Sequence, residues 1–285
     1  MIRQKSFENE KATLYVVATP IGNLDEMTAC AIHVLESVDV IAAEDTRNTL
    51  KLLNYFGIRT RLIAHHQHNE EQSANGLLEL LRQGKNVAIV SDAGYPLISD
   101  PGSVVAKKVM EEGFNVVPIS GSNAMLNALV ASGMNTRHFL FYGFLKAQEK
   151  ERIRELHELK YYPFTIVFYE APHRIEKMLK SCLEVLGNRQ ICLARELTKK
   201  HEEFIRGTIE EVLEIVDDIK GEMVVVIEGC SEEKNPGEDQ ASPLVHEQIK
   251  TYIDGGLTTN EAIKRVAKEL GLSKNDLYKE YHELS

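Results

Sequence analysis

The chain has 285 residues, enough for about two domains, and its hydrophobic content of 43% and charged content of 27% are ordinary for a soluble globular protein. Its net charge of −10 argues against a protein held to nucleic acid by bulk electrostatics, because neutralising phosphates requires lysine and arginine. The four cysteines form no CxxC pair, and the chain has neither an apolar run of the ~20 residues that a membrane span needs nor the apolar core of a signal peptide. We therefore expect a reduced, cytoplasmic location and no contact with a membrane.

The first half of the chain alternates short apolar strands with helices. The spacing predicts strands over residues 14–18, 39–43, 61–64, 86–91 and 115–119. It predicts helices over residues 24–38, 70–82 and 102–112. A further helix is expected to start at Thr46, whose hydroxyl would cap it. Such alternation implies a largely parallel sheet that is covered on both faces.

A highly charged helix is expected over 146–160, after which strands resume. The later strands are expected over 165–169, 190–194, 204–206 and 222–228. They would form a second sheet, so we expect the α/β class with two α/β domains, residues 1–143 and 144–230.

The remainder of the chain reads as a linker and a small helical module. Residues 231–242 are polar and rich in helix breakers, which is typical of a linker. Residues 243–285 are expected to hold a helix over 258–270, capped by Gly271, and a second helix capped by Ser273. This helix-turn-helix-like module has no basic excess, since residues 241–285 contain six Lys/Arg and seven Asp/Glu. We therefore favour a packing or partner-docking role over contact with nucleic acid.

Ligands of parallel sheets bind at the carboxyl ends of the strands, so the loops there are the candidate sites. The loop over 91–102 (SDAGYPLISDPG) holds two aspartates, two glycines and two prolines directly after a buried strand. A loop this constrained favours a ligand-binding backbone over a simple turn. The loop over 19–23 (TPIGN) matches neither GxGxxG nor a Walker pattern, so a dinucleotide or triphosphate site is not supported.

Two further loops carry polar residues that suit catalysis. Glu44 and Asp45 stand beside Arg47 at the end of the second strand, where they either form a solvated ion pair or orient a substrate hydroxyl. Residues 65–69 (HHQHN) follow the third strand and hold three histidines, but no HExxH motif accompanies them. We expect no metal there; the alternatives are proton handling, RNA contact or a solvated loop.

Seven segments in a fixed order make the chain recognisable. They are VATPIGNL, AAEDTR, HHQHNE, SDAGYPLISDPG, FYEAPHR, LARELTK and GEMVVVIEG. Together they resemble the ribosomal RNA small subunit methyltransferase I family of the tetrapyrrole methylase superfamily. The resemblance implies two α/β domains that hold S-adenosyl-L-methionine in the cleft between them, a homodimer, and 2′-O-ribose methylation of a cytidine in the decoding region of 16S rRNA. One departure is ISGSNA over 119–124, where relatives often carry a PGPSA-like turn.

The resemblance also implies functional residues, with cofactor contacts from the rims of both domains. We expect these contacts at Thr19, Pro20, Asp92, Ala93, Gly94, Ile98, Ser122, Asn123, Tyr169, Ala194 and Met223. Methyl transfer must also relieve the hydroxyl of its proton. The catalytic candidates are Glu44, Asp45 and His66, with Arg47 and Asn69 as orienting residues. No metal is required, because the sulfonium is already an activated donor. An acidic chain would use local cations for RNA, such as Arg152, Arg154 and Lys199.

Two other functions stay open. The first is a porphyrinoid methyltransferase of the same superfamily, against which the AEDTR and SDAG motifs and the C-terminal module argue. The second is a non-enzymatic, nucleic-acid-binding regulator that uses the C-terminal helices; the lack of basic excess argues against it, and we expect no binding to DNA. The sequence also leaves open whether free RNA or the assembled small ribosomal subunit is the substrate.

Overall fold

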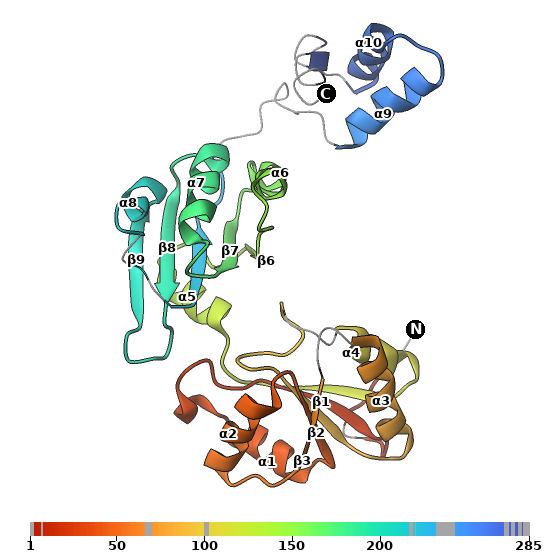
Figure 1. The fold of residues 1–285 in the computed structure, drawn as a ribbon, viewed down its shortest axis with the longest axis vertical. Helices are drawn as coiled ribbons and strands as arrows, with labels where there is room; N and C mark the ends of the chain where they lie inside the picture. Colours follow the sequence, from red (N-terminus) through yellow and green to blue (C-terminus); the bar gives the residue numbers. More distant parts are fainter. Residues whose placement is uncertain are drawn as a thin grey trace. The chain divides into compact units, whose positions relative to one another are not determined.

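The computed structural model describes residues 3–6, 8–65, 70–99, 103–216, 219, 221–231, 243–270, 274, 277, 278 and 281. The chain divides into two compact units, Met1–Cys230 and Ser231–Ser285 (Figure 1). Apart from Ser231, the expected linker lies outside the described residues, as do the expected caps Gly271 and Ser273. Within the described residues, no helix has the length and apolar character to cross a bilayer.

The first unit begins with a five-stranded parallel sheet, as the alternating pattern predicted. Its strands are β1 (Thr13–Val17), β2 (Val40–Ala43), β3 (Arg61–Ala64), β4 (Val87–Val90) and β5 (Asn115–Ile119). Their order is β3-β2-β4-β1-β5, and every neighbouring pair is parallel. Because side chains alternate between the faces of a strand, Val87 and Ile89 of β4 enter one apolar cluster and Ala88 and Val90 enter another.

Helices cover both faces of this sheet. They are α1 (Ala29–Ser37), α2 (Thr46–Phe56), α3 (Glu70–Arg82) and α4 (Ser103–Glu111). The helix expected over 24–38 is interrupted: a 3-10 turn, η1 (Leu24–Glu26), which buries no side chain, precedes α1. Leu35 of α1 and Leu53 of α2 pack in one cluster, and Leu77 of α3 and Val109 of α4 pack in the other. Figure 1 shows α1 and α2 on one side of the sheet and α3 and α4 on the other. The expected cap of α2 was wrong: Asp45, not Thr46, is the N-cap.

A second sheet, of mixed direction, follows in the same unit. Its strands are β6 (Phe139–Gly143), β7 (Thr165–Glu170), β8 (Gln190–Arg195), β9 (Glu203–Thr208) and β10 (Met223–Ile227). Their order is β6-β7-β10-β8-β9; only β6 and β7 are parallel, and the other neighbours are antiparallel. The carboxyl ends of β6, β7 and β8 therefore share one rim with the start of β10.

Helices cover this sheet too. α6 (Glu149–Leu159), α7 (Ile175–Leu186) and α8 (Ile209–Leu213) pack in the apolar cluster on one face. α5 (Ala124–Ser132) packs on the other face through Ala128 and Leu129. β6, α5, α7 and α8 are not among the elements predicted from the sequence. The structure thus places β6 and α5 with the second sheet, N-terminal of the boundary expected at 143/144.

The second unit has a small apolar core of its own. It contains α9 (Pro243–Asp254) and α10 (Thr259–Leu270), which agrees with the helix predicted over 258–270. The core is built by Ile249, Ala262, Ile263, Val266, Ala267 and Leu277.

Candidate functional site

The loops after β1 and β4 are joined by a backbone bridge at the carboxyl rim of the first sheet. The Thr19 amide donates to the Gly94 carbonyl oxygen at 2.9 Å, and the Gly94 amide donates to the Thr19 carbonyl oxygen at 3.0 Å. The Thr19 hydroxyl also donates to the Ser91 carbonyl oxygen, at 3.3 Å. The two loops that the sequence singled out for cofactor binding are therefore held together by the main chain.

Two loops carry unusual backbone strain. Among the described residues, four that are not glycine have positive φ angles: Leu97 (74°), Ser99 (62°), Glu196 (48°) and Thr198 (65°). The first two lie in the loop after β4, and the other two lie in the loop after β8. Such conformations are costly, most of all for a β-branched residue such as Thr198, and they concentrate at ligand-binding sites.

The turn after β5 approaches the first strand closely. A Cβ atom on Gly121 would lie 2.9 Å from the Ala18 Cβ, so only glycine fits there. The Ser122 hydroxyl donates to Glu26 Oε2 at 2.6 Å, and the Asn123 side chain caps α5 by accepting from the Leu126 amide at 3.0 Å. The turn over 119–124, which departs from the proline-rich sequence of relatives, is thus still tight. The side chains of Ser122 and Asn123 form hydrogen bonds within the protein.

The acidic turn after β2 contains a helix cap and an exposed ion pair. Asp45 Oδ1 accepts from the Arg47 amide at 2.8 Å, and its carboxylate pairs with the guanidinium at 2.6 Å (Oδ2 to Nη2). The hydrogen bonds from Arg47 hold the pKa of Asp45 well below its usual range. The Arg47 side chain is 86% exposed, so its outer face is open to a substrate. Asn48 links this turn to the loop after β4 by donating to Asp92 Oδ2 at 3.1 Å.

A small pocket, with no room for a water molecule in this structure, lies at the ends of the central strands. It is lined by Glu44, His65, Ile89, Val90, Ser91 and Pro96. His65 is buried, and its Nδ1 lies 2.6 Å from the Ser73 hydroxyl on α3. His66 and Asn69 lie outside the described residues. Sequence reasoning selected His66 and missed that His65 shares a pocket with Glu44; its position as the first residue after β3 was the available signal.

The remaining expected cofactor residues lie on the rim of the second sheet. Met223 is paired with both Glu170 and Arg195, and Ala194 is the residue before Arg195. Ala194 and Met223 are buried, while Tyr169 is half-buried. The Tyr169 ring lies edge-on to Phe141, with the ring centroids 4.9 Å apart.

The two rims contact each other through these loops. The Asn23 amide donates to the Thr198 hydroxyl at 3.1 Å. A Cβ atom on Gly143, at the end of β6, would lie 3.3 Å from the Ser99 hydroxyl. The structure therefore brings together the loops after β1, β4, β6 and β8. The site also contains histidines and carboxylates, but among the described residues no three His, Cys, Asp or Glu side chains are grouped as metal ligands.

Comparison with known proteins identifies the family of the chain. Residues 13–213 match the family of Tetrapyrrole (Corrin/Porphyrin) Methylases. The chain is 48% identical to a "Ribosomal RNA small subunit methyltransferase I" of Bacillus subtilis over 98% of both chains. It is 41% identical to the protein of that name from Synechocystis, over 93% of this chain and 95% of the relative.

Solved structures share the fold at low sequence identity. The methyltransferase CobJ has a TM-score of 0.59 at 19% identity, covering 79% of this chain and 97% of that one. A diphthine synthase has a TM-score of 0.58 at 11% identity, covering 76% of this chain and 90% of that one.

Proposed function

The chain belongs to the tetrapyrrole methylase family, and on this premise we propose that it transfers a methyl group from S-adenosyl-L-methionine to 16S rRNA of the small ribosomal subunit. The acceptor in this proposal is the ribose 2′-hydroxyl of a cytidine in the decoding region. One observation carries it: the 48% identity to a ribosomal RNA small subunit methyltransferase I spans 98% of both chains, including the second unit. The uroporphyrin-III-C-methyltransferase of Thermus thermophilus, by contrast, is 19% identical and covers 76% of the chain.

The residues at the joined loops fit the cofactor. Gly94, at φ 75°, allows a ligand to approach the backbone, and the strained loop from Asp92 to Ile98 continues this surface. The other contacts in this proposal come from Thr19, Pro20, Ala93, Ser122, Asn123, Tyr169, Ala194 and Met223. When bound, the cofactor supplies a methyl group on a positively charged sulfur, which is already activated for displacement. The protein must then align the acceptor oxygen with this group and accept its proton.

In this proposal Glu44 is the base that accepts that proton. It lines the pocket at the ends of the central strands together with His65. Asp45 is committed to capping α2 and to holding Arg47, so in this proposal its role is to position the guanidinium against the ribose or its phosphate. His66 and Asn69 complete the set of candidates.

An exposed apolar face of α5 supports a homodimer, and the proposed substrate implies the cytoplasm. Leu126 and Val130 of α5 are four residues apart, on one face of the helix, and are 45% and 72% exposed. A second copy would cover this apolar face, as association commonly does in symmetric dimers. The compartment follows from the proposed substrate, since ribosomal subunits are cytoplasmic.

A direct comparison of substrates tests the proposal. Purified protein with labelled S-adenosyl-L-methionine is offered small ribosomal subunits, naked 16S rRNA and a precorrin-type porphyrinoid. We expect label in 16S rRNA, at a ribose 2′-oxygen that is unmethylated in a strain lacking the gene. Label in the porphyrinoid alone would make the chain a porphyrinoid methyltransferase. A gel shift on duplex DNA without any methyl transfer would favour the regulator.

A further inference from the structure

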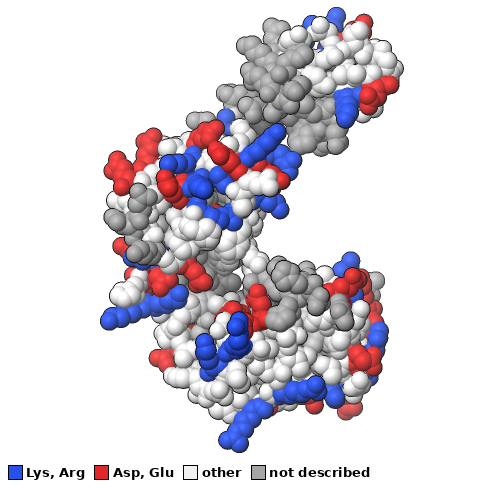
Figure 2. Space-filling view, viewed as in Figure 1, with Lys and Arg blue, Asp and Glu red and all other residues white. Residues whose placement is uncertain are grey.

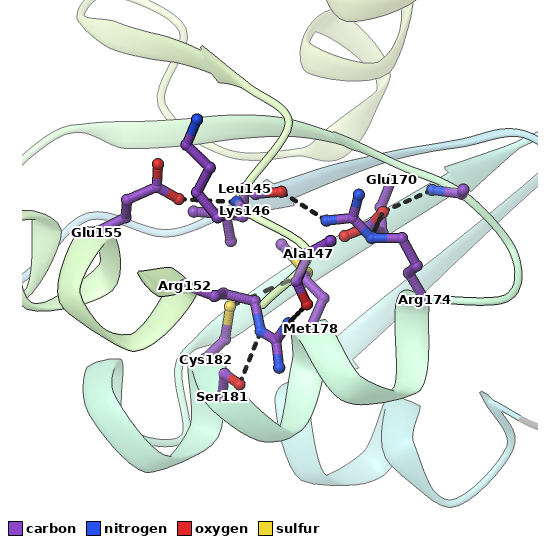
Figure 3. A network of polar contacts seen from close by, with 11 residues as sticks. Leu145, Lys146, Ala147, Arg152, Glu155, Glu170, Arg174, Met178, Ser181 and Cys182 are labelled. Atoms are coloured by element: carbon purple, nitrogen blue, oxygen red, sulfur yellow. Dashed lines mark hydrogen bonds and ion pairs between the residues drawn. The ribbon is translucent and has the colours of Figure 1, made fainter. Parts of the chain in front are cut away.

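The loop between β6 and α6 is held at three successive residues by two side chains of α6 and by Arg174, the N-cap residue of α7. Arg174 Nη2 donates to the Leu145 carbonyl oxygen at 2.5 Å. Glu155 Oε2 accepts from the Lys146 amide at 2.9 Å, and Arg152 Nη1 donates to the Ala147 carbonyl oxygen at 3.0 Å. Figure 3 shows these side chains converging on the loop backbone. The conformation of the loop is therefore fixed by tertiary contacts.

The two arginines that hold the loop are themselves anchored by polar groups of the interior. Arg152, expected to be a surface cation for RNA, is buried, because its guanidinium is used internally: its Nε donates to the Ser181 hydroxyl at 3.0 Å. Arg174 Nε lies 3.1 Å from Glu170 Oε1, and the Glu170 side chain is 1% exposed. A buried ion pair is seldom the cheapest way to stabilise a fold, since desolvation offsets much of its attraction. Its use here favours a role in setting the geometry of the loop.

The fixed loop presents an aromatic ring and a cation to solvent. Phe144 is 49% exposed, although its ring leans edge-on against Tyr169 with the centroids 5.6 Å apart. Lys146, two residues further, is exposed as well. Gly143, just before the ring, adjoins Ser99 of the loop after β4, so this surface borders the candidate site.

The surrounding charge favours a local contact over a broad one. On the face drawn in Figure 2, Lys and Arg are interspersed with Asp and Glu, which agrees with the net charge of −10. A protein of this kind can still bind single-stranded RNA, by stacking unpaired bases on aromatic rings and placing single cations against phosphates.

We propose that the loop from Phe144 to Gln148 is a nucleobase platform for the substrate RNA: the Phe144 ring stacks on an unpaired base beside the target nucleotide, and Lys146 contacts a neighbouring phosphate. This inference rests on the proposed function, because it specifies how the same site takes RNA. Extruding a ribose for reaction leaves neighbouring bases unstacked, and a rigid ring beside the site offers such a base a new partner.

The test compares Phe144→Leu and Phe144→Trp with the parental protein in methyl transfer to small ribosomal subunits. Leucine keeps an apolar side chain but removes the aromatic face, so KM for the subunit should rise roughly 5- to 150-fold, as expected for loss of one stacked base. Tryptophan should restore the parental KM, and calorimetry should show unchanged cofactor affinity in both variants. Lys146→Ala should lower the salt dependence of subunit binding by about one unit of slope.

Phe164→Leu is the matched control, because Phe164 is 39% exposed but lies just before β7, at the opposite end of the sheet. It should leave KM unchanged. A parental KM in Phe144→Leu would overturn the platform while leaving the methyltransferase assignment intact. Loss of cofactor affinity in Phe144→Leu would also overturn it, by moving the ring to the cofactor site. If the parental protein fails to methylate small subunits, the proposed function falls and this inference falls with it.

Discussion

The backbone amide of Asn23 donates a hydrogen bond to the hydroxyl of Thr198 at 3.1 Å. Asn23 follows β1 of the first sheet, whereas Thr198 follows β8 of the second, so the bond joins the rims of both sheets. Thr198 adopts a positive φ of 65° in making it. A β-branched residue in this conformation requires support from its surroundings, which suggests that the junction itself is functional.

We therefore predict that the first sheet alone does not bind the cofactor. A fragment of residues 1–143 keeps α5 but removes the strands β8 and β10 on which that helix packs, so it exposes Ala128 and Leu129 as well. Calorimetry with S-adenosyl-L-methionine should detect no binding to this fragment. The matched fragment is 1–230, which is a compact unit and should bind with full-length affinity. Full affinity in the shorter fragment would contradict a site shared by both rims.

Gly94→Val should weaken cofactor binding, since Gly94 lies in the loop after β4 at φ 75°. The added Cβ would lie 3.4 Å from Cγ2 of Ile21 in the loop after β1, so a branched side chain would strain the backbone and force apart the two loops proposed to hold the cofactor. Gly57→Val is a matched control, because Gly57 has the same φ of 75° at the end of α2 and an added Cβ would meet nothing within 4 Å. Both variants should lose stability, roughly 1–2 kcal/mol or more, from the left-handed backbone. Only Gly94→Val should also lose cofactor affinity in calorimetry; equal affinities would refute the assignment.

Catalysis should not require a metal, despite the histidines after β3. The sulfonium is an activated donor, and His65 Nδ1 already lies 2.6 Å from the Ser73 hydroxyl. After exhaustive chelation and dialysis, the rate of methyl transfer to small subunits should be unchanged. Subunits restored to the same magnesium concentration serve as the control, because chelation alone disrupts the substrate. If chelation of the enzyme lowers the rate of methyl transfer and added zinc restores it, catalysis does require a metal.

Much of the first sheet follows from local patterns. β3 and β5 have their predicted bounds, because each is a short, mainly apolar run that ends at a polar residue. Glu44 and Gly94 lie at the carboxyl rim of the sheet because they follow the ends of β2 and β4. α5 escapes prediction because AMLNALVAS is apolar around its circumference: Val130 is 72% exposed while Ala128 is buried.

The finer contacts of the site depend on tertiary geometry. Thr46 and Asp45 are both good capping types, so the backbone conformation alone decides that Asp45 is the cap. The contact between His65 and Ser73 joins a strand end to the next helix, and no local periodicity indicates it.

Glu170 gives the protein a pH dependence of stability with a definite sign. Burial raises the pKa of this carboxyl above its ordinary 4.5, and the hydrogen bond from the Ala171 amide and the charge of Arg174 only partly oppose the shift. Ionisation then costs more in the folded than in the unfolded protein, so the stability that Glu170 contributes below its ordinary pKa is lost as the pH rises through the raised value. Each unit of the shift corresponds to about 1.4 kcal/mol.

Glu170→Gln removes this titration. In urea unfolding between pH 4 and pH 8, the variant should therefore gain stability relative to the parental protein as the pH rises. Glu176→Gln is a control of opposite sign: the hydrogen bond from Lys180 lowers the pKa of this exposed carboxyl, so this variant should not gain stability relative to the parental protein as the pH rises. If the stability of the parental protein instead rises relative to that of Glu170→Gln as the pH rises, the attraction to Arg174 outweighs the burial. The pKa of Glu170 is then lowered, not raised.

The acidic turn after β2 should serve the ribose rather than the fold. An exposed ion pair such as Asp45–Arg47 stabilises a protein by only ~0–1 kcal/mol, so Arg47→Ala should fold normally. Glu44→Gln keeps the size of a side chain that lines the pocket beside His65, and it removes the base. A group that orients or deprotonates the hydroxyl contributes roughly 10²–10⁴-fold to the rate, so both variants should bind cofactor normally and methylate that much more slowly.

Single-turnover methyl transfer to small subunits measures this, with cofactor affinity followed in parallel. Two controls separate function from structure. Lys180→Ala breaks another exposed ion pair, with Glu176 on α7, and should react at the parental rate. Asp45→Ala removes the cap of α2 and should cost about 1 kcal/mol of stability as well as slowing the reaction, because Arg47 loses its support. If Glu44→Gln and Arg47→Ala both turn over at the parental rate, the turn is structural, and the next residues to test are His65, His66 and Asn69.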